Sequence, residues 1–188
     1  MKPFIALAFG IFALSTQASL ITIDLSSGWY SYDQLGGHKN INVVINLNTL
    51  LGMPAGSPVE IDGIGWDLNI ATVGASWLSE AALNFDHGSL ILIPGTGVDA
   101  PGDQFFSSAG VISLVALGGA NIVLSDGLLT LEFFETFDAT PLEIDAILSG
   151  TLTLSTVMAP VPVPAALWML ASGLFATGLL DRTRRRAA

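Results

Sequence analysis

The chain has 188 residues, of which 51% are hydrophobic, only 12% are charged and none is cysteine. This length allows one ordinary domain plus terminal segments, and the lack of cysteine excludes disulfides, thiolate metal sites and thiol catalysis. The stretch from Ser19 to Ala159 holds 15 acidic residues against Lys39 alone, a formal charge of −14. Such a domain cannot neutralise a phosphate backbone, which excludes nucleic acid as a partner.

The first 18 residues predict a secretory signal peptide. Lys2 supplies the positive charge, Phe4–Leu14 forms the apolar region, and Ser15–Ala18 provides a small-residue exit. This order of features is typical of a cleaved signal. We expect signal peptidase to cut between Ala18 and Ser19. Because serine and not cysteine follows the cut, acylation as a lipoprotein is excluded.

The middle of the chain alternates apolar and polar residues, as strands with one buried face do. Leu20–Leu25, Ile41–Asn48 and Ile64–Ile70 show this period of two most clearly. Further apolar runs are Trp77–Phe85, Leu90–Ile93, Val111–Leu117, Ile122–Leu124, Leu128–Phe137 and Ile147–Leu154. Short strands separated by turn residues predict an antiparallel sandwich. We therefore expect an all-β domain over residues 19–157, a jelly-roll-like sandwich of eight or nine strands.

The turn residues and the core can also be predicted. Asp126-Gly127 suits a tight type I′ hairpin, and His87-Gly88 and Gly118-Gly119 mark other reversals. Pro94–Asp103 reads as a loop, and no stretch of the middle has the caps and period of a helix. The expected core includes Val43, Ile45, Trp66, Leu68, Phe133 and Leu152.

The C-terminal segment predicts a single membrane-spanning helix. Ala165–Leu180 is uncharged over 16 residues, which as a helix would extend ~24 Å against a hydrocarbon core of ~30 Å. Four arginines within residues 182–188 favour a cytoplasmic C-terminus. We expect a linker at 158–164, the helix at 165–181 and a basic cytoplasmic tail at 182–188. Together with a cleaved signal, this places the middle domain outside the cytoplasmic membrane.

Prolines, a short apolar helix and terminal arginines occur together in the segment VPVPAALWMLASGLFATGLLDRTRRR. In this combination the segment resembles the PEP-CTERM protein-sorting signal, in its VPLPA-type variant. The matching residues are Val161, Pro162 and Pro164 in the motif, Trp168, Ser172 and Gly173 in the helix, and Arg184, Arg185 and Arg186 in the tail. Val163 stands where the name-giving motif has glutamate.

The resemblance implies a route and a processing enzyme. Exosortase, an integral membrane protease-transpeptidase of Gram-negative bacteria, recognises this signal in species that make exopolysaccharide and biofilm. The protein is then a membrane-anchored precursor with its domain on the periplasmic side, which is later moved to the outer envelope or the outside of the cell. The resemblance covers only the C-terminal segment and is silent on the domain that it delivers.

The middle domain carries no recognisable catalytic motif. It has no G-x-S-x-G elbow and no glycine-rich phosphate loop with a following lysine. A glycosidase needs two carboxylates that face each other ~5–10 Å apart. On a regular strand Glu132 and Glu135 point to opposite faces, while Glu132 and Asp138 share a face ~20 Å apart. His38 and His87 lie in predicted loops. We expect a protein without enzymatic activity.

Two binding hypotheses remain for the domain. Trp29, Tyr30 and Tyr32 form an aromatic cluster that could stack on sugar rings, which makes a carbohydrate-binding module for exopolysaccharide the alternative to a plain envelope or matrix protein. No cofactor is expected, although loop carboxylates are the ligands that calcium prefers. The candidate calcium ligands are Asp99, Asp103, Asp138, Glu143 and Asp145.

The signal peptide generates the first prediction. The mature protein should begin at Ser19, because the small-residue exit ends at Ala18. N-terminal sequencing of the protein from the envelope fraction checks this. A mature chain that retains Met1 would contradict it, whereas a cut within two residues of Ala18 would only move the site.

Overall fold

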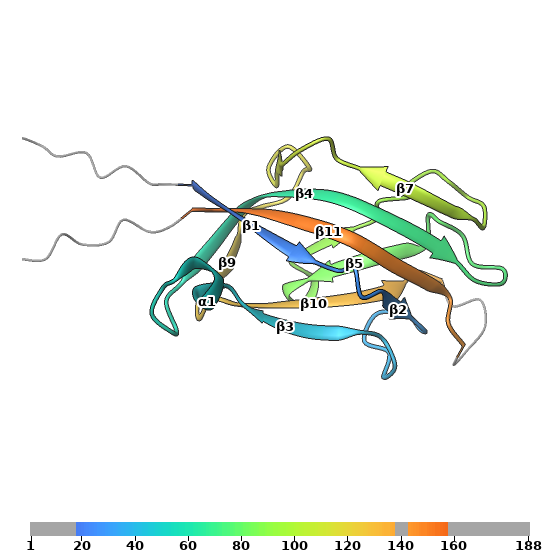
Figure 1. Ribbon diagram of the computed structural model, residues 1–188, viewed down its shortest axis with the longest axis horizontal. Coiled ribbons are helices and arrows are strands. Elements are labelled where there is room, and N and C mark those ends of the chain that lie inside the picture. The colour runs from blue at the N-terminus through green and yellow to red at the C-terminus, as the bar shows by residue number, and fades with distance from the viewer. Residues whose placement is uncertain (1–17, 138–142, 158–188) are drawn as a thin grey trace, which may run out of the picture.

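The structure is a computed structural model that describes residues 18–137 and 143–157. Two antiparallel sheets form the domain (Figure 1). The strands are β1 (Ala18–Asp24), β2 (Trp29–Ser31), β3 (Asn42–Asn46), β4 (Val59–Thr72), β5 (Ala81–Phe85), β6 (Leu90–Leu92), β7 (Asp103–Ser107), β8 (Ile112–Ser113), β9 (Ile122–Leu124), β10 (Leu128–Glu135) and β11 (Ala146–Val157). A short helix, α1 (Leu47–Leu51), and a 3-10 turn, η1 (Asp86–Gly88), complete the elements. Within the described residues no helix is long and apolar enough to cross a membrane.

The larger sheet has seven strands but is no wider than the four-stranded sheet. β1 and β2 follow one another along one edge of β11, while β7, β8 and β9 follow one another along the far edge of β4. The centre of this sheet is the long antiparallel ladder between β4 and β11. The smaller sheet has the order β3-β10-β5-β6.

The strand pairs are nested within one another along the chain. β5 pairs with β6, β4 pairs with β7 to β9, β3 pairs with β10, and β1 and β2 pair with β11. The described chain is therefore folded back on itself once, and the outermost pair brings its first and last described residues together. Ala18 lies opposite Val157, and Figure 1 shows the start of β1 and the end of β11 at one end of the domain with β2 at the other.

One apolar core fills the space between the sheets. Phe85 and Phe133 are among its largest fully buried side chains. In β11 the residues Leu148, Leu152 and Leu154 are completely buried and alternate with serine and threonine. The period of two therefore predicted this strand correctly. Of the expected core, Leu68, Phe133 and Leu152 are confirmed, while Ile45 and Trp66 are partly buried against the core.

The position of Val43 was predicted wrongly. Its side chain is 36% exposed, although Val43 lies opposite the fully buried Leu131. β3 is an edge strand of the smaller sheet, so that its inward face is covered on one side only. Alternation in the sequence shows which residues share a face but not whether the strand lies at an edge.

The hairpin expected at Asp126-Gly127 is also wrong. β9 belongs to the larger sheet and β10 to the smaller one, so this turn connects the two sheets. The Asn48 side chain donates a hydrogen bond to the Asp126 carbonyl (2.8 Å), and Leu47 donates its N–H to Gly127 (2.9 Å). The turn is therefore held by α1 and not by a ladder between its flanking strands. The reversals at His87-Gly88 and Gly118-Gly119 are confirmed.

Two elements depart from the predicted pattern. Leu47 and Asn48, expected in a strand, begin helix α1, because the Asn46 side chain caps it by accepting from the Thr49 N–H (3.0 Å). Asp103–Ser107 follows the loop predicted from Pro94 and forms β7, since the edge of β4 is open to receive it.

A glycine in the central ladder generates the second prediction. Gly150 has φ +125°, and a Cβ there would overlap the Asp67 carbonyl oxygen of β4. Gly52 also has positive φ, +66°, but nothing lies within 4 Å of its Cβ position. Gly150→Ala should lower the free energy of unfolding by about 3 kcal/mol or more, and Gly52→Ala by about 1 kcal/mol. Urea unfolding of both variants measures the difference, and equal losses would show that β4 and β11 are not in this register.

Candidate functional site

The alternation of β2 separates two kinds of side chain at the end of the domain farthest from its termini. Trp29 and Ser31 point inward and are buried, at 8% and 0% exposure. Tyr30 and Tyr32 point outward and are half-buried, as the period of a strand requires. The expectation of sugar stacking is therefore corrected for Trp29, whose ring belongs to the core and cannot meet a ligand.

The two tyrosines form an aromatic pair with a cation beside it. Their ring centroids lie 6.4 Å apart at an interplanar angle of 42°. The Lys39 Nζ atom lies 5.9 Å from the centroid of the Tyr32 ring, within the range of a cation–π contact. The predicted aromatic cluster thus exists as a surface pair built from β2 and the loop that follows it.

A buried carboxyl fixes β2 from the inside. The Ser31 hydroxyl donates to Glu135 Oε1 on β10 (3.0 Å), and Glu135 is fully buried. Burial raises the pKa of the Glu135 carboxyl to about 8; the Ser31 hydrogen bond opposes this shift, and the negative charges of Asp145 and Glu80 add to it. Its other oxygen, Oε2, has no hydrogen-bond partner among the described residues. Burial therefore favours the protonated, neutral form of Glu135.

A second carboxyl fixes the loop between β2 and β3. Glu132 is 5% exposed, and its Oε1 accepts from the Gly36 N–H (2.7 Å) and the Asn40 side chain (3.0 Å). The same Asn40 accepts from the Tyr32 N–H (3.0 Å) and donates to the Gln34 carbonyl (2.9 Å). The backbone position of Tyr32 is thus determined by a network that begins on β10.

The predicted orientation of Glu132 and Glu135 agrees with the structure. Glu132 and Glu135 do point to opposite faces of β10, since one meets the loop and the other meets Ser31. Both carboxyls are buried, as is the candidate calcium ligand Asp145 at 1% exposure. The sequence did carry a signal for this burial. Leu131, Phe133 and Phe134 flank the two acids, and a strand with apolar residues on both faces is covered on both faces.

The remaining predicted sites are scattered. Asp99 accepts from Ser79 (2.7 Å), Asp103 from Asn69 (2.6 Å) and Asp145 from Ser76 (3.2 Å), while Glu143 is exposed. Among the described residues no group of three or more acidic or histidine side chains is arranged to hold a metal ion. Asp138 lies outside the described residues, and a calcium site stays a prediction.

The predicted sorting residues and the predicted helix 165–181 lie outside the described residues. The sorting residues are Val161, Pro162, Val163, Pro164, Trp168, Ser172, Gly173 and Arg184 to Arg186. The predicted cleavage pair, Ala18 and Ser19, begins β1.

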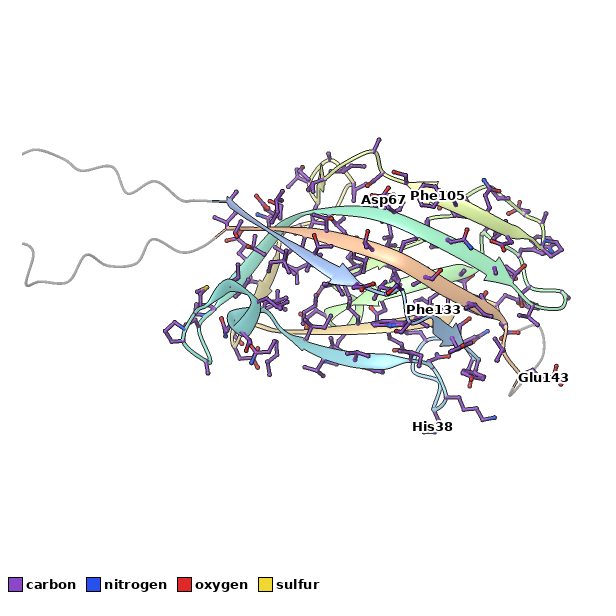
Figure 2. The ribbon with its side chains drawn as sticks, in the orientation of Figure 1. His38, Asp67, Phe105, Phe133 and Glu143 are labelled. Carbon is purple, nitrogen blue, oxygen red and sulfur yellow. The ribbon has the colours of Figure 1, made fainter. Side chains whose placement is uncertain are left out.

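The two histidines lie in loops, as expected. His38 is exposed at the tip of the loop between β2 and β3 (Figure 2). His87 is exposed in the turn between β5 and β6, where it borders a hollow of about 350 Å³ on the smaller sheet with Asp86, Asp126 and Val44. The structure records no hydrogen bond between His87 and either acid.

Comparison with known proteins gives no assignment. No family model and no curated protein matches this chain. Among solved structures, the tobacco streak virus coat protein is 16% identical over 78% of this chain and 90% of its own, with a TM-score of 0.31. The infectious bursal disease virus VP2 particle is 16% identical over 82% and 36%, with a TM-score of 0.30. The Desmodium yellow mottle tymovirus structure is 12% identical over 86% and 99%, with a TM-score of 0.27. Similarities at these scores carry no argument about function.

The buried carboxyl generates the third prediction. The pKa of Glu135 is higher in the folded state than in the unfolded chain, so the protonated carboxyl favours the folded state. This contribution to the free energy of unfolding is fully present below the unfolded pKa near 4.5 and is lost as the pH rises to about 8. Over that window stability should fall by up to about 1.4 kcal/mol per pH unit. Glu135→Gln keeps an acceptor for Ser31 but does not ionise, so its stability should depend less on pH.

Urea unfolding of the wild type, Glu135→Gln and the exposed control Glu143→Gln, between pH 5 and pH 9, provides the measurement. Parallel curves for the wild type and Glu135→Gln would show that this carboxyl is not buried as described.

Proposed function

We propose that this chain is a non-enzymatic protein of the cell envelope or extracellular matrix, exported by its signal peptide and delivered by a PEP-CTERM-like sorting signal. Signal peptidase and an exosortase-type protease are its processing enzymes. Before processing, the C-terminal helix anchors it in the cytoplasmic membrane with the domain on the periplasmic side. Afterwards it resides in the outer envelope or outside the cell.

The observation that carries this proposal is the pairing of the first and last described strands. Ala18 lies opposite Val157 and Ser19 opposite Thr156, whose hydroxyl donates to the Ser19 carbonyl (3.2 Å). Both proposed membrane segments therefore join the domain at the same end. The Met158–Pro164 linker can span at most ~25 Å when fully extended, which keeps that end near the membrane. The aromatic pair on β2 is then presented away from it.

We also infer that the domain is a jelly roll. The nested pairing supports this topology: along the chain, every connection between successive strand positions changes sheet except the one from β5 to β6. Eight strand positions in two sheets, formed by folding one long antiparallel pair, are the pattern of that architecture.

The burial of the carboxyls supports the absence of catalysis. Glu135 and Asp145 are close enough to interact electrostatically, but both are sealed from solvent, at 0% and 1% exposure. Glu132 is occupied by the loop that it holds. A glycosidase needs its pair of carboxylates open to a sugar and a water.

The alternative, a carbohydrate-binding module, is favoured by the tilted pair of Tyr30 and Tyr32 on the surface. Aromatic rings present a broad apolar face at low entropic cost, and the apolar face of a sugar ring packs against it. This alternative is compatible with export and differs only in assigning a ligand.

Two epitopes in one chain test the sorting proposal. One is placed after Arg186 and the other in the exposed loop around His38, which lies at the end remote from the termini. In the native host we expect the C-terminal epitope to be lost by a cut near residues 161–164, while the domain epitope leaves the cytoplasmic membrane. Removal of Arg182–Arg186 should retain the precursor. If wild-type cells keep both epitopes on one full-length membrane protein, the tail is only an anchor and the sorting proposal is wrong.

A further inference from the structure

We propose that the outer face of the seven-stranded sheet binds a polysaccharide whose sugars carry free amino groups. The outer face comprises the residues of that sheet that point away from the core, from Tyr30 on β2 to Phe105 on β7. The inference rests on the proposed function, because a protein held in the envelope meets polysaccharide there.

Strand register defines the composition of this face, because residues directly opposite each other on paired strands share a face. Its rows read Asp24–Thr151–Asp67–Ser107, then Ser149–Asn69–Phe105, then Tyr30–Ile147–Ala71–Asp103. Every one of these residues is exposed or half-buried. Hydroxyl and amide groups that both donate and accept hydrogen bonds thus occupy the middle of the face, and they complement the hydroxyls of a sugar chain.

Aromatic rings border the face on both sides. Phe105 is 60% exposed and lies opposite Asn69, and Figure 2 shows it beside Asp67. On the other border Tyr30 lies opposite Ile147 and is followed by Tyr32. Three strand spacings separate the two borders, about 14 Å. A chain of sugars laid across the strands would therefore meet an aromatic ring at each side and polar groups between them.

The charge of the face selects the class of sugar. Asp24, Asp67 and Asp103 all lie on it, and it carries no lysine or arginine. Hydrogen bonds from the Ser26 side chain and backbone hold the pKa of Asp24 below its usual value. The Asp67 carboxylate is exposed and accepts no hydrogen bond from the described residues.

Three carboxylates outnumber the one cation at the border of the face, Lys39 beside Tyr32. The face therefore repels uronate, sulfate or phosphate polymers and attracts protonated amines. The same amines are attracted to the faces of Phe105 and Tyr30.

Binding by the purified full-length protein in a mild nonionic detergent tests the proposal. The probes are a chitosan oligosaccharide, the fully N-acetylated chitin oligosaccharide of equal length and an oligogalacturonate, at a pH that keeps the chitosan amines protonated. Chitosan should bind most tightly and oligogalacturonate should not bind. Phe105→Ala and Asp67→Asn should each weaken chitosan binding by about tenfold.

Matched controls separate this face from general charge attraction. Phe137→Ala removes a second phenylalanine that is also 60% exposed, and Glu143→Gln removes one exposed charge that Figure 2 places far from Asp67. Both controls should bind chitosan within twofold of the wild type. If the variants on the face bind as the controls do, the face is not the site. If the acetylated oligosaccharide binds as tightly as chitosan, the assignment to amino groups is overturned.

The result is independent of export, because the protein is purified before binding is measured. Loss of the binding leaves the sorting proposal unaffected, and retention of the C-terminal epitope in cells leaves the binding site unaffected.

Discussion

The pairing of β11 with a strand on each side is the constraint on which the rest of this structure depends. Along one edge β11 receives β1 and β2, and along the other it pairs with β4 over nearly its whole length. Its leucines supply part of the core while its serines and threonines form the outer face of the larger sheet. A shift of one residue would exchange these two sets, so the core itself fixes the register. From that register follow both the neighbouring ends of the domain and the rows of the proposed binding face.

The two ends of the domain have different tasks in this account. At one end β1 and β11 bring together the points at which the terminal segments join. At the other end β2 and its loop carry Tyr30, Tyr32 and Lys39. This second end contains two pairs of buried polar groups, because Glu135 binds Ser31 and Glu132 binds Asn40. The network of Glu132 and Asn40, which holds the loop through four hydrogen bonds, restricts it to one arrangement, and a preorganised surface loses less entropy on binding.

Much of the fold could be predicted from local pattern, and most of the failures share a cause. β1, β9 and β11 were found because alternation is a local property, and Phe133 was placed correctly in the core. The turn at Asp126-Gly127 fits a hairpin locally, but β9 finds its partner in Val59–Ile61 and not in β10. Asp103–Ser107 became a strand because an edge of β4 was open to it. The hydrogen-bond partner of Glu135 is Ser31, which lies 104 positions away in the chain. These failures concern partners that are distant in sequence, whereas helix α1 was missed although its cap, from Asn46 to Thr49, is local.

Cross-linking of β1 to β11 tests the central claim most directly, since the chain has no cysteine of its own. Thr22 lies opposite Thr153, and both point outward. The Leu25 N–H donates to the Gly150 carbonyl (2.8 Å), which makes Thr22 and Thr153 a non-hydrogen-bonded pair with Cα atoms ~4.5 Å apart. That separation suits a disulfide.

The variant with Thr22→Cys and Thr153→Cys, exported in its native host, should form this disulfide completely, as thiol labelling of the denatured protein would report. A control with Thr22→Cys and Ser155→Cys, displaced by two residues on the same face, should remain largely reduced. Equal oxidation of both variants, or of neither, would contradict the register that joins the ends of this domain.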